Sequence, residues 1–324
     1  NYLWHNKIPM GMLTLFLGDA GLGKSFLSLY IAAIVSTGGD WPDGDDLSKS
    51  QCPIGSVVIL SAEDDLEHII RPRLDTLKAD CSKIISLEAV SVCNVDGNKF
   101  QKYFSLKDDL LALEQAIKSC TDCRLVIIDP LSAYLGDKTD SYRDSDVRSI
   151  LAPLVQLAEQ HQVAVIGVMH LNKNNDKKAI HRGLGSVAFT ATARTVWLVS
   201  EDPENPASKR RLFTPLKHNV LVDPTGLALE IIDGKVVFEK EPLDMTADEA
   251  LQGSTVDAPL LEKAKNWLIG QLPKGKSVAT LALTEAAKQA GITPSTLRRA
   301  KEELNVHSFP IKIQDKNVWF VQIQ

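Results

Sequence analysis

The octapeptide Gly18-Asp-Ala-Gly-Leu-Gly-Lys-Ser25 constrains the fold of this chain more than any other segment. It matches the pattern G-x-x-x-x-G-K-[ST], follows an apolar run at residues 13–17 and precedes a helical pattern at 24–35. A strand, a glycine-rich turn and a helix in that order form a P-loop, whose backbone N–H groups surround a phosphate. We therefore expect a nucleotide to contact Gly18, Asp19, Ala20, Gly21, Leu22, Gly23, Lys24, Ser25 and Phe26.

Three side chains are expected to act on those phosphates. Lys24 would reach the β- and γ-phosphates, and the Ser25 hydroxyl would ligate Mg²⁺. The run at 125–128 ends in Asp129, a strand-terminal carboxylate suited to hold the same Mg²⁺. The alternative for Asp129 is that it caps the following turn. The sequence thus predicts ATP and Mg²⁺ as cofactors.

Another carboxylate is a candidate for activating water. The run at 57–60 leads into Ser-Ala-Glu63-Asp64-Asp65, and Glu63 is the first of these acids. A carboxylate at a strand end can act as a general base, so Glu63 is the candidate base. Helix capping is the alternative for Glu63. Asp64 and Asp65 are interpreted as the N-cap and the first-turn residue of the next helix.

The apolar runs predict an α/β fold. Runs at 13–17, 57–60, 125–128, 163–169 and 195–199 are near-continuous, as in strands buried on both faces of a mostly parallel sheet. Helical patterns at 24–35, 106–117 and 148–161 lie between them, and Pro153 is expected to kink the last or mark its true start. Segments 211–216, 226–232 and 235–239 predict antiparallel strands at one side of the sheet.

A second domain is predicted after residue 240. Residues 1–240 form the ATPase domain, 241–258 a linker, and 259–324 a small α+β domain. The last domain combines helical patterns at 260–272, 280–290 and 293–304 with strands at 308–313 and 317–323. Thr293 is the expected N-cap of the third helix. Three helices and a hairpin suggest a winged helix-turn-helix.

Charge differs sharply between the two predicted domains. The chain has 324 residues and a net charge of −5, which by itself argues weakly against a nucleic-acid partner. Residues 259–324 contain ten basic and five acidic side chains, so they carry +5 and residues 1–258 carry −10. The third helix presents Arg298, Arg299 and Lys301, which suit DNA contact. A protein-docking role for this domain is the alternative.

Composition also limits location and redox chemistry. No apolar run reaches the length of a membrane span, no signal peptide opens the sequence, and the five cysteines are irregularly spaced. We expect a cytoplasmic protein with reduced thiols and no membrane partner. Cys120-Thr-Asp-Cys123 has metal-site spacing but lacks a second ligand pair, so it is interpreted as a turn.

The order of these motifs resembles the RecA-like ATPase core, and within it the RepA-type helicases and the wider RepA/DnaB-related group. The resemblance covers about residues 3–240 and includes the opening Ile8-Pro-Met-Gly-Met-Leu-Thr-Leu-Phe-Leu-Gly-Asp-Ala-Gly-Leu-Gly-Lys24. It implies that Glu63 is the catalytic base and that His170, at the end of the 163–169 run, senses the γ-phosphate. A simple polar strand end is the alternative for His170.

The resemblance also implies contacts with DNA and with a second subunit. The segment 173–182 occupies the place of a channel loop, and its DNA-contacting residues would be Lys173, Lys177, Lys178 and Arg182. Arg194 takes the place of an arginine finger inserted in trans, and Lys217 that of the lysine in a Lys-x-Arg pair whose arginine is here Asn219. A solvated loop and a structural ion pair are the respective alternatives for segment 173–182 and for Arg194.

The function implied is an ATP-dependent DNA helicase or translocase in replication of a plasmid, phage or mobile element. Trans contacts require a homo-oligomer, and the resemblance implies a hexameric ring around single-stranded DNA. The predicted winged helix would bind DNA or replication proteins. Two alternatives stay open: a regulatory ATPase that does not translocate, and a recombination-accessory ATPase that forms filaments.

Overall fold

The computed structural model describes residues 1–43, 51–87, 89–93, 99–136, 143–171, 187–205, 208–222, 224–243, 245–252, 258–272, 277–313 and 316–323. The chain forms two compact units, Asn1–Asp248 and Glu249–Gln324. Helix α7 (Ala247–Gln252) lies within the segment predicted as a linker. Met245, Ala247 and Ala250 are buried in this segment. Burial of these apolar side chains stabilises the short helix, although the sequence shows no helical periodicity of apolar residues.

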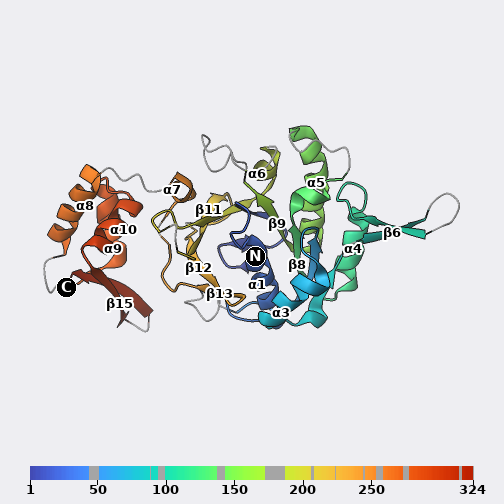
Figure 1. Cartoon of the computed structure of the whole chain (residues 1–324), viewed down its shortest axis with the longest axis horizontal. Helices are drawn as coiled ribbons and strands as arrows, with labels where there is room; N and C mark the ends of the chain where they lie inside the picture. Colours follow the sequence, from blue (N-terminus) through green and yellow to red (C-terminus); the bar gives the residue numbers. More distant parts are fainter. Residues whose placement is uncertain are drawn as a thin grey trace. The chain divides into compact units, whose positions relative to one another are not determined.

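A nine-stranded sheet forms the centre of the first unit (Figure 1). Its strand order is β13-β12-β11-β10-β3-β9-β8-β4-β5. The strands are β3 (Leu13–Gly18), β4 (Ser56–Ser61), β5 (Ile84–Ser86), β8 (Cys123–Asp129), β9 (Ala164–His170), β10 (Thr195–Glu201), β11 (Arg211–His218), β12 (Leu227–Ile232) and β13 (Lys235–Phe238). Two short antiparallel pairs lie apart from it: β1 (Tyr2–Trp4) with β2 (Ile8–Pro9), and β6 (Ala89–Cys93) with β7 (Lys99–Tyr103).

The six strands from β10 to β5 are parallel, so their carboxyl ends share one edge of the sheet; five of them were predicted from apolar runs, and the short β5 was not. The P-loop strand β3 lies between β9 and β10. Most side chains of β3, β4, β8, β9 and β10 are buried, which explains their continuous apolar sequences. The parallel order places the end of β3 beside the end of β9, with Gly18 opposite His170, and the end of β4 beside the end of β8.

Helices cover both faces of the sheet. Right-handed crossovers place α1 (Lys24–Thr37) and α3 (Arg71–Thr76) on one face, because the chain moves from β3 to β4 and on to β5. The chain then reverses direction across the sheet, so α4 (Leu110–Ser119), α5 (Asp144–His161) and α6 (Ala188–Thr192) cover the other face. The contacts between α1 and α3, and those of α5 with α4 and α6, agree with this division.

Helix α5 begins at Asp144, so Pro153 lies inside it and does not mark its start. One backbone bond is lost at the proline. Burial of Ile150, Leu151, Leu154 and Leu157 around it keeps the helix continuous. Packing therefore outweighs the local preference at this position.

Strands β11, β12 and β13 are antiparallel, as predicted, and extend the sheet beyond β10. Because β11 runs against β10, it begins at the edge where the parallel strands end: Glu201, the last residue of β10, pairs with Arg211, the first of β11. This register brings a late part of the chain to the P-loop edge of the sheet.

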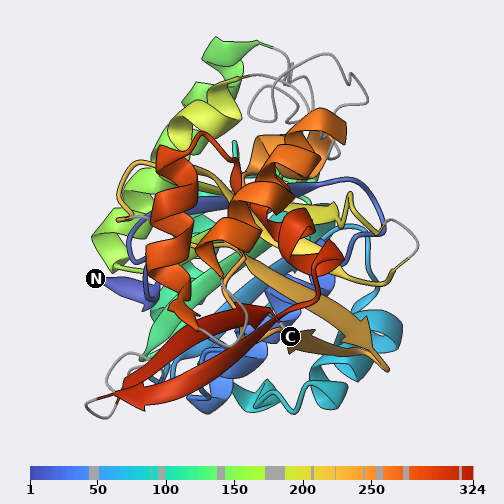
Figure 2. The ribbon, with the colours of Figure 1, turned by 90° about the vertical axis from the view of Figure 1, so that its left-hand side faces the viewer.

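The second unit contains three helices and a three-stranded antiparallel sheet of order β14-β16-β15 (Figure 2). Its elements are α8 (Ala258–Gln271), β14 (Val278–Ala279), α9 (Thr280–Gln289), α10 (Pro294–Glu303), β15 (Val306–Ile313) and β16 (Lys316–Ile323). Leu268, Leu283, Leu297 and Val321 form its buried core. The predicted N-cap is present, since the Thr293 side chain accepts a hydrogen bond from the Thr296 N–H.

No helix in the described ranges is both long and apolar enough to cross a membrane.

Candidate functional site

The P-loop has the backbone geometry that its glycines permit. Gly21 and Gly23 adopt positive φ angles of 78° and 88°, in the left-handed region that favours glycine. A Cβ at Gly18 would lie 2.3 Å from the carbonyl oxygen of Val199 in β10, so no side chain fits between these two strands. The loop therefore depends on glycine for its turn and for its close approach to the sheet.

Lys24, the first residue of α1, is almost completely buried, with 4% of its surface exposed. Its ammonium donates hydrogen bonds to the backbone oxygens of Gly18 (2.9 Å) and Asp19 (2.7 Å). Burial lowers the pKa of Lys24, while the negative charges of Asp129, Asp19 and Glu63 oppose that shift. The P-loop thus encloses a positive charge beneath the position expected for the phosphates.

Asp129 and Ser25 lie together at the end of β8 and the start of α1. Burial raises the pKa of Asp129, as do the nearby carboxylates Glu63 and Asp64, and a hydrogen bond from Ser25 opposes the shift. A hydroxyl and a carboxylate are oxygen ligands of the type that Mg²⁺ takes alongside phosphates. A cation there would also offset the crowded negative charge, so the residues present fit Mg²⁺.

Glu63 and His170 meet across the edge of the sheet. Nε2 of His170 lies 3.5 Å from Oε1 of Glu63, and Nδ1 lies 3.4 Å from Nζ of Lys24. An ammonium group can only donate, so Nδ1 is the acceptor and the neutral ring carries its proton on Nε2, facing the carboxylate. His170 therefore links the P-loop lysine to the candidate base.

The two acids after Glu63 have different roles. Asp65, predicted as a first-turn residue, is instead the N-cap of the short π-helical turn η1 (Leu66–Ile70), because its side chain accepts a hydrogen bond from the His68 N–H. Asp64 is not a cap: it accepts a hydrogen bond from Arg73 at 2.5 Å, and the Arg73 guanidinium lies 4.3 Å from the Phe26 ring centroid. The sequence prediction for Asp64 was wrong because a partner nine residues away competes with the local backbone.

The P-loop lies beside a cavity of about 780 Å³. Lys24, Ser25, Glu63, Asp129 and His170 are brought together there, as the sequence predicted. The remaining walls are formed by Ala20, Gly21, Leu22, Gly23, Phe26, Asp64, Arg73, Val168, Lys209, Arg211 and Ile231. Four of these residues, Arg73, Lys209, Arg211 and Ile231, were not predicted from the sequence. The signal for Arg211 is that an antiparallel strand after β10 begins at the P-loop edge of the sheet.

Arg194 and Lys217 lie at the opposite edge of the sheet. Arg194 directly precedes Thr195, which pairs with Thr14 near the start of β3, so roughly 20 Å of strand separates it from the P-loop edge. Lys217 donates to the backbone oxygens of Thr190 (2.7 Å), Ala191 (3.1 Å) and Ala193 (2.7 Å). Burial lowers the pKa of Lys217, and so does the charge of Arg194 beside it.

The expected DNA-binding residues divide into two groups. Lys173, Lys177, Lys178 and Arg182 lie outside the described residues. Arg298, Arg299 and Lys301 all belong to α10, where each is partly exposed.

The Cys120–Cys123 pair is a turn, as interpreted from the sequence. Cys120 follows the end of α4, Cys123 begins β8, and both are free thiols. Burial raises the pKa of Cys123 to about 12, so its thiol is unreactive near neutral pH. The described part of the chain contains no cluster of three or more His, Cys, Asp or Glu residues suited to a metal ion.

Comparison with known proteins gives a family. Residues 1–176 match the family model AAA_25, described as "AAA domain". No curated protein matches the sequence. Among solved structures, one described as "Crystal structure of the RadB recombinase" is similar with a TM-score of 0.49 at 14% identity, over 71% of this chain and 91% of that chain.

Proposed function

The chain belongs to the AAA domain family, whose model matches more than half of its length, and we propose that this RecA-like P-loop ATPase is a DNA helicase or translocase of the RepA/DnaB type. It would act in replication of a plasmid, phage or mobile element. One observation carries the ATPase part of the proposal: Lys24, Asp129, Glu63 and His170 line a single cavity beside the P-loop.

Each group has a distinct task in hydrolysis. Lys24 and the P-loop N–H groups hold the β- and γ-phosphates, and Ser25 with Asp129 would hold Mg²⁺, which neutralises phosphate charge. Glu63 accepts a proton from the attacking water. Its side chain is 59% exposed, so water reaches it, and its Oε1 lies 3.5 Å from Nε2 of His170. His170 connects this water-activating step to Lys24 at the phosphate end.

Arg194 is proposed to act on the nucleotide of a neighbouring subunit. Its place at the opposite edge of the sheet prevents it from reaching the cavity of its own chain. A second copy could present that edge to the cavity, and repetition of this head-to-tail contact gives a ring. We propose a hexamer around single-stranded DNA, with the basic segment 173–182 as its channel loop.

The second unit is proposed to be a winged helix that contacts DNA or a replication partner. The order of three helices and an antiparallel hairpin supports this assignment, as does the +5 charge of residues 259–324. Arg298, Arg299 and Lys301 on α10 would contact phosphates and base edges. Replacing Arg299 with glutamine would then weaken DNA binding and reduce its salt dependence.

Strand displacement on a forked duplex tests the helicase proposal. Wild-type protein with ATP and Mg²⁺ should release the labelled strand, and the Lys24→Ala variant should not. Electron microscopy with an ATP analogue and single-stranded DNA tests the ring. ATP hydrolysis without strand release would contradict the helicase assignment while leaving the ATPase intact.

One observation favours a second function, a regulatory or recombination-accessory ATPase that binds DNA or protein without unwinding. Lys217 is held by three backbone oxygens of its own chain, and Asn219 replaces the arginine of the expected Lys-x-Arg pair. Such a protein would hydrolyse ATP slowly and form filaments or no ordered assembly in the same micrographs.

A further inference from the structure

The turn between β10 and β11 forms one wall of the nucleotide cavity. Lys209 and Arg211 line that cavity from this turn, together with Ile231 from β12. Ile231 lies directly over the P-loop, since a Cβ on Gly23 would meet its Cδ1 at 2.3 Å. The same chain that supplies the P-loop thus supplies two further cations to the cavity.

These cations approach from the side opposite the groups that act on the γ-phosphate. Asp129 and His170 end β8 and β9, which lie on one side of β3, whereas β10, β11 and β12 lie on the other. The three phosphates of ATP form a linear chain, and the P-loop encloses the middle one. If the γ-phosphate faces Asp129 and His170, the α-phosphate and the ribose leave the loop toward β10 and β11.

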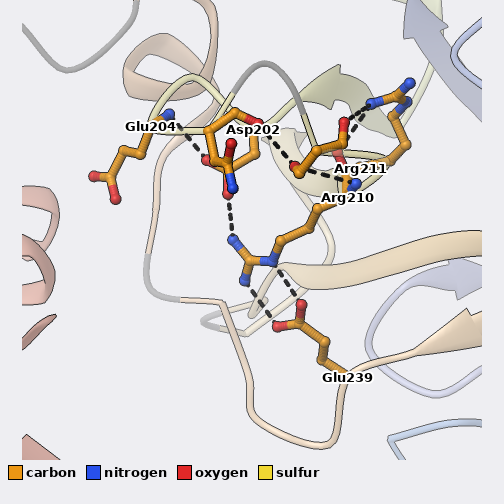
Figure 3. Close-up of polar contacts among 7 residues, drawn as sticks. Asp202, Glu204, Arg210, Arg211 and Glu239 are labelled. Atoms are coloured by element: carbon orange, nitrogen blue, oxygen red, sulfur yellow. Dashed lines mark hydrogen bonds and ion pairs between the residues drawn. The ribbon is translucent and has the colours of Figure 1, made fainter.

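Arg210, between the two cations, is fixed by acids on both sides (Figure 3). It donates to Glu239 through Nε (2.6 Å) and Nη2 (2.8 Å), and to Asp202 through Nη1 (2.8 Å). The second carboxylate oxygen of Asp202 accepts from the Glu204 N–H at 3.0 Å. This cluster joins the end of β10, the turn and the end of β13, so it fixes where β11 begins.

Arg211 points away from that cluster (Figure 3), as expected of consecutive residues in an extended segment. Its Nη1 donates to the backbone oxygens of Ser208 (3.3 Å) and Arg210 (3.1 Å). Among the described residues, Nε and Nη2 of Arg211 have no acceptor, and Lys209 forms no ion pair. Two positive groups with unused donors therefore border the cavity.

We propose that Arg211 and Lys209 bind the α-phosphate of the nucleotide within their own subunit, and that Arg210 is a positioning residue held by Asp202 and Glu239. The P-loop, Asp129 and His170 account for the β- and γ-phosphates. The α-phosphate is therefore the anionic group of the nucleotide nearest to Arg211 and Lys209. This inference rests on the proposed ATP-binding function and adds cis contacts to it. Arg211 is the principal contact, and the more exposed Lys209 adds a weaker one.

Calorimetric titration of the full chain with Mg²⁺-ADP and with a non-hydrolysable Mg²⁺-ATP analogue tests the proposal. Arg211→Gln should weaken both by about tenfold, the effect of losing one charge-assisted hydrogen bond. Lys209→Gln should weaken both by about two- to threefold, because solvent screens its charge. The two nucleotides should respond equally, since both contain the α-phosphate.

Two matched variants serve as controls. Arg124→Gln removes a guanidinium at the other edge of the sheet, and Lys235→Gln removes an exposed ammonium at the start of β13; neither side chain lines the cavity. Both should leave affinity unchanged. Unchanged affinity in Arg211→Gln, or a loss confined to the ATP analogue, would overturn the α-phosphate assignment. Because binding is measured without turnover, a chain that binds nucleotide but hydrolyses none contradicts only the proposed function.

A double-variant experiment tests the positioning role. Glu239→Gln breaks the bidentate pair with Arg210, so it should weaken ADP binding about threefold in the wild-type background and not at all in the Arg211→Gln background. The melting temperature is measured in parallel. An equal loss of ADP affinity in both backgrounds would show that Glu239 acts independently of Arg211, and a lowered melting temperature with unchanged ADP affinity would show that it acts on stability alone; either result contradicts the positioning role.

Discussion

Nε2 of His170 lies 3.5 Å from Oε1 of Glu63, although His170 ends β9 and Glu63 follows the end of β4, and β8 separates these two strands in the sheet. Through its other nitrogen, His170 lies 3.4 Å from the Lys24 ammonium. The ring therefore lies between the P-loop lysine and the carboxylate proposed to activate water. Movement of Lys24 toward a γ-phosphate would therefore be transmitted to Glu63.

Replacing Glu63 by glutamine should lower the turnover number for ATP by about 10²–10⁴, because the amide cannot accept the proton of the attacking water. Nucleotide affinity should change little, since Glu63 does not belong to the P-loop. Steady-state phosphate release and calorimetric titration measure the two quantities. Glu67→Gln is the matched control, because Glu67 is an exposed acid on η1 outside the cavity.

Replacing His170 by glutamine should lower turnover while leaving the affinity for ADP near that of the wild type. An amide cannot reproduce the pair of contacts that the ring makes with Lys24 and Glu63. The same two assays separate the effects. Equal losses in ADP affinity and turnover would instead assign His170 to general binding of the nucleotide.

Replacing Lys24 by alanine should abolish hydrolysis, a loss of at least about 10³, because the buried ammonium is the positive charge nearest to the P-loop backbone. Circular dichroism checks that the variant keeps its helices. Substantial ATPase activity in folded Lys24→Ala protein would disprove the assignment of the phosphate site.

Replacing Asp129 by asparagine should stabilise the nucleotide-free protein at pH 7 while removing Mg²⁺-dependent hydrolysis. Its folded-state pKa is raised by burial, so its carboxylate destabilises the fold at neutral pH. As the pH falls through that raised pKa toward 3.8, the wild-type carboxyl becomes protonated and the penalty disappears. The stability difference between variant and wild type should therefore shrink with acidification, as urea unfolding at pH 7 and pH 4 would show.

Asp122 provides the opposite case for the same experiment. Hydrogen bonds from Lys83 and Ser56 lower the pKa of this carboxyl, so its ionised form stabilises the fold above its unfolded pKa. Asp122→Asn should destabilise the protein at pH 7 by less than about 1 kcal/mol, and the loss should vanish in acid. Stabilisation by both substitutions would show that a general charge effect, not burial, governs Asp129.

Replacing Arg194 by alanine should abolish ATP hydrolysis if it completes the site of a neighbouring subunit. Mixing this variant with Lys24→Ala protein should restore part of the activity, since mixed interfaces pair an intact P-loop with an intact arginine. Phosphate release as a function of mixing ratio measures the effect. Inactive mixtures, from variants that each still assemble, would contradict a trans role.

The principal site could be predicted from the sequence because of how parallel sheets are built. Lys24, Asp129, Glu63 and His170 each follow an apolar run, and the carboxyl ends of parallel strands meet at one edge. The ends of parallel strands therefore lie close together, regardless of the length or conformation of the loops that connect them. The same reasoning places Arg194 at the other edge, because it precedes its strand.

The residues that sequence analysis missed depend on contacts that no local pattern contains. Arg211 reaches the cavity because it pairs with Glu201 at the end of β10, and the contacts of Arg210 with Asp202 and Glu239 support that pairing. The sequence predicts Asp64 as a helix cap, whereas in the structure it forms an ion pair with Arg73. In each case a polar contact between side chains determines where the residue lies. Such contacts leave no periodic pattern in the sequence, so they cannot be predicted from it.

The central position of β3 affects the order in which this protein can fold as it is synthesised. Its neighbours in the sheet are β9 and β10, at residues 164–170 and 195–201, so the P-loop strand emerges from the ribosome long before either strand that flanks it. Pairing across such sequence separations is slow. The nascent chain must keep the apolar segment Leu13–Leu17 from aggregating until residue 201 has been made, and a product that ends earlier has a P-loop sequence without a nucleotide site.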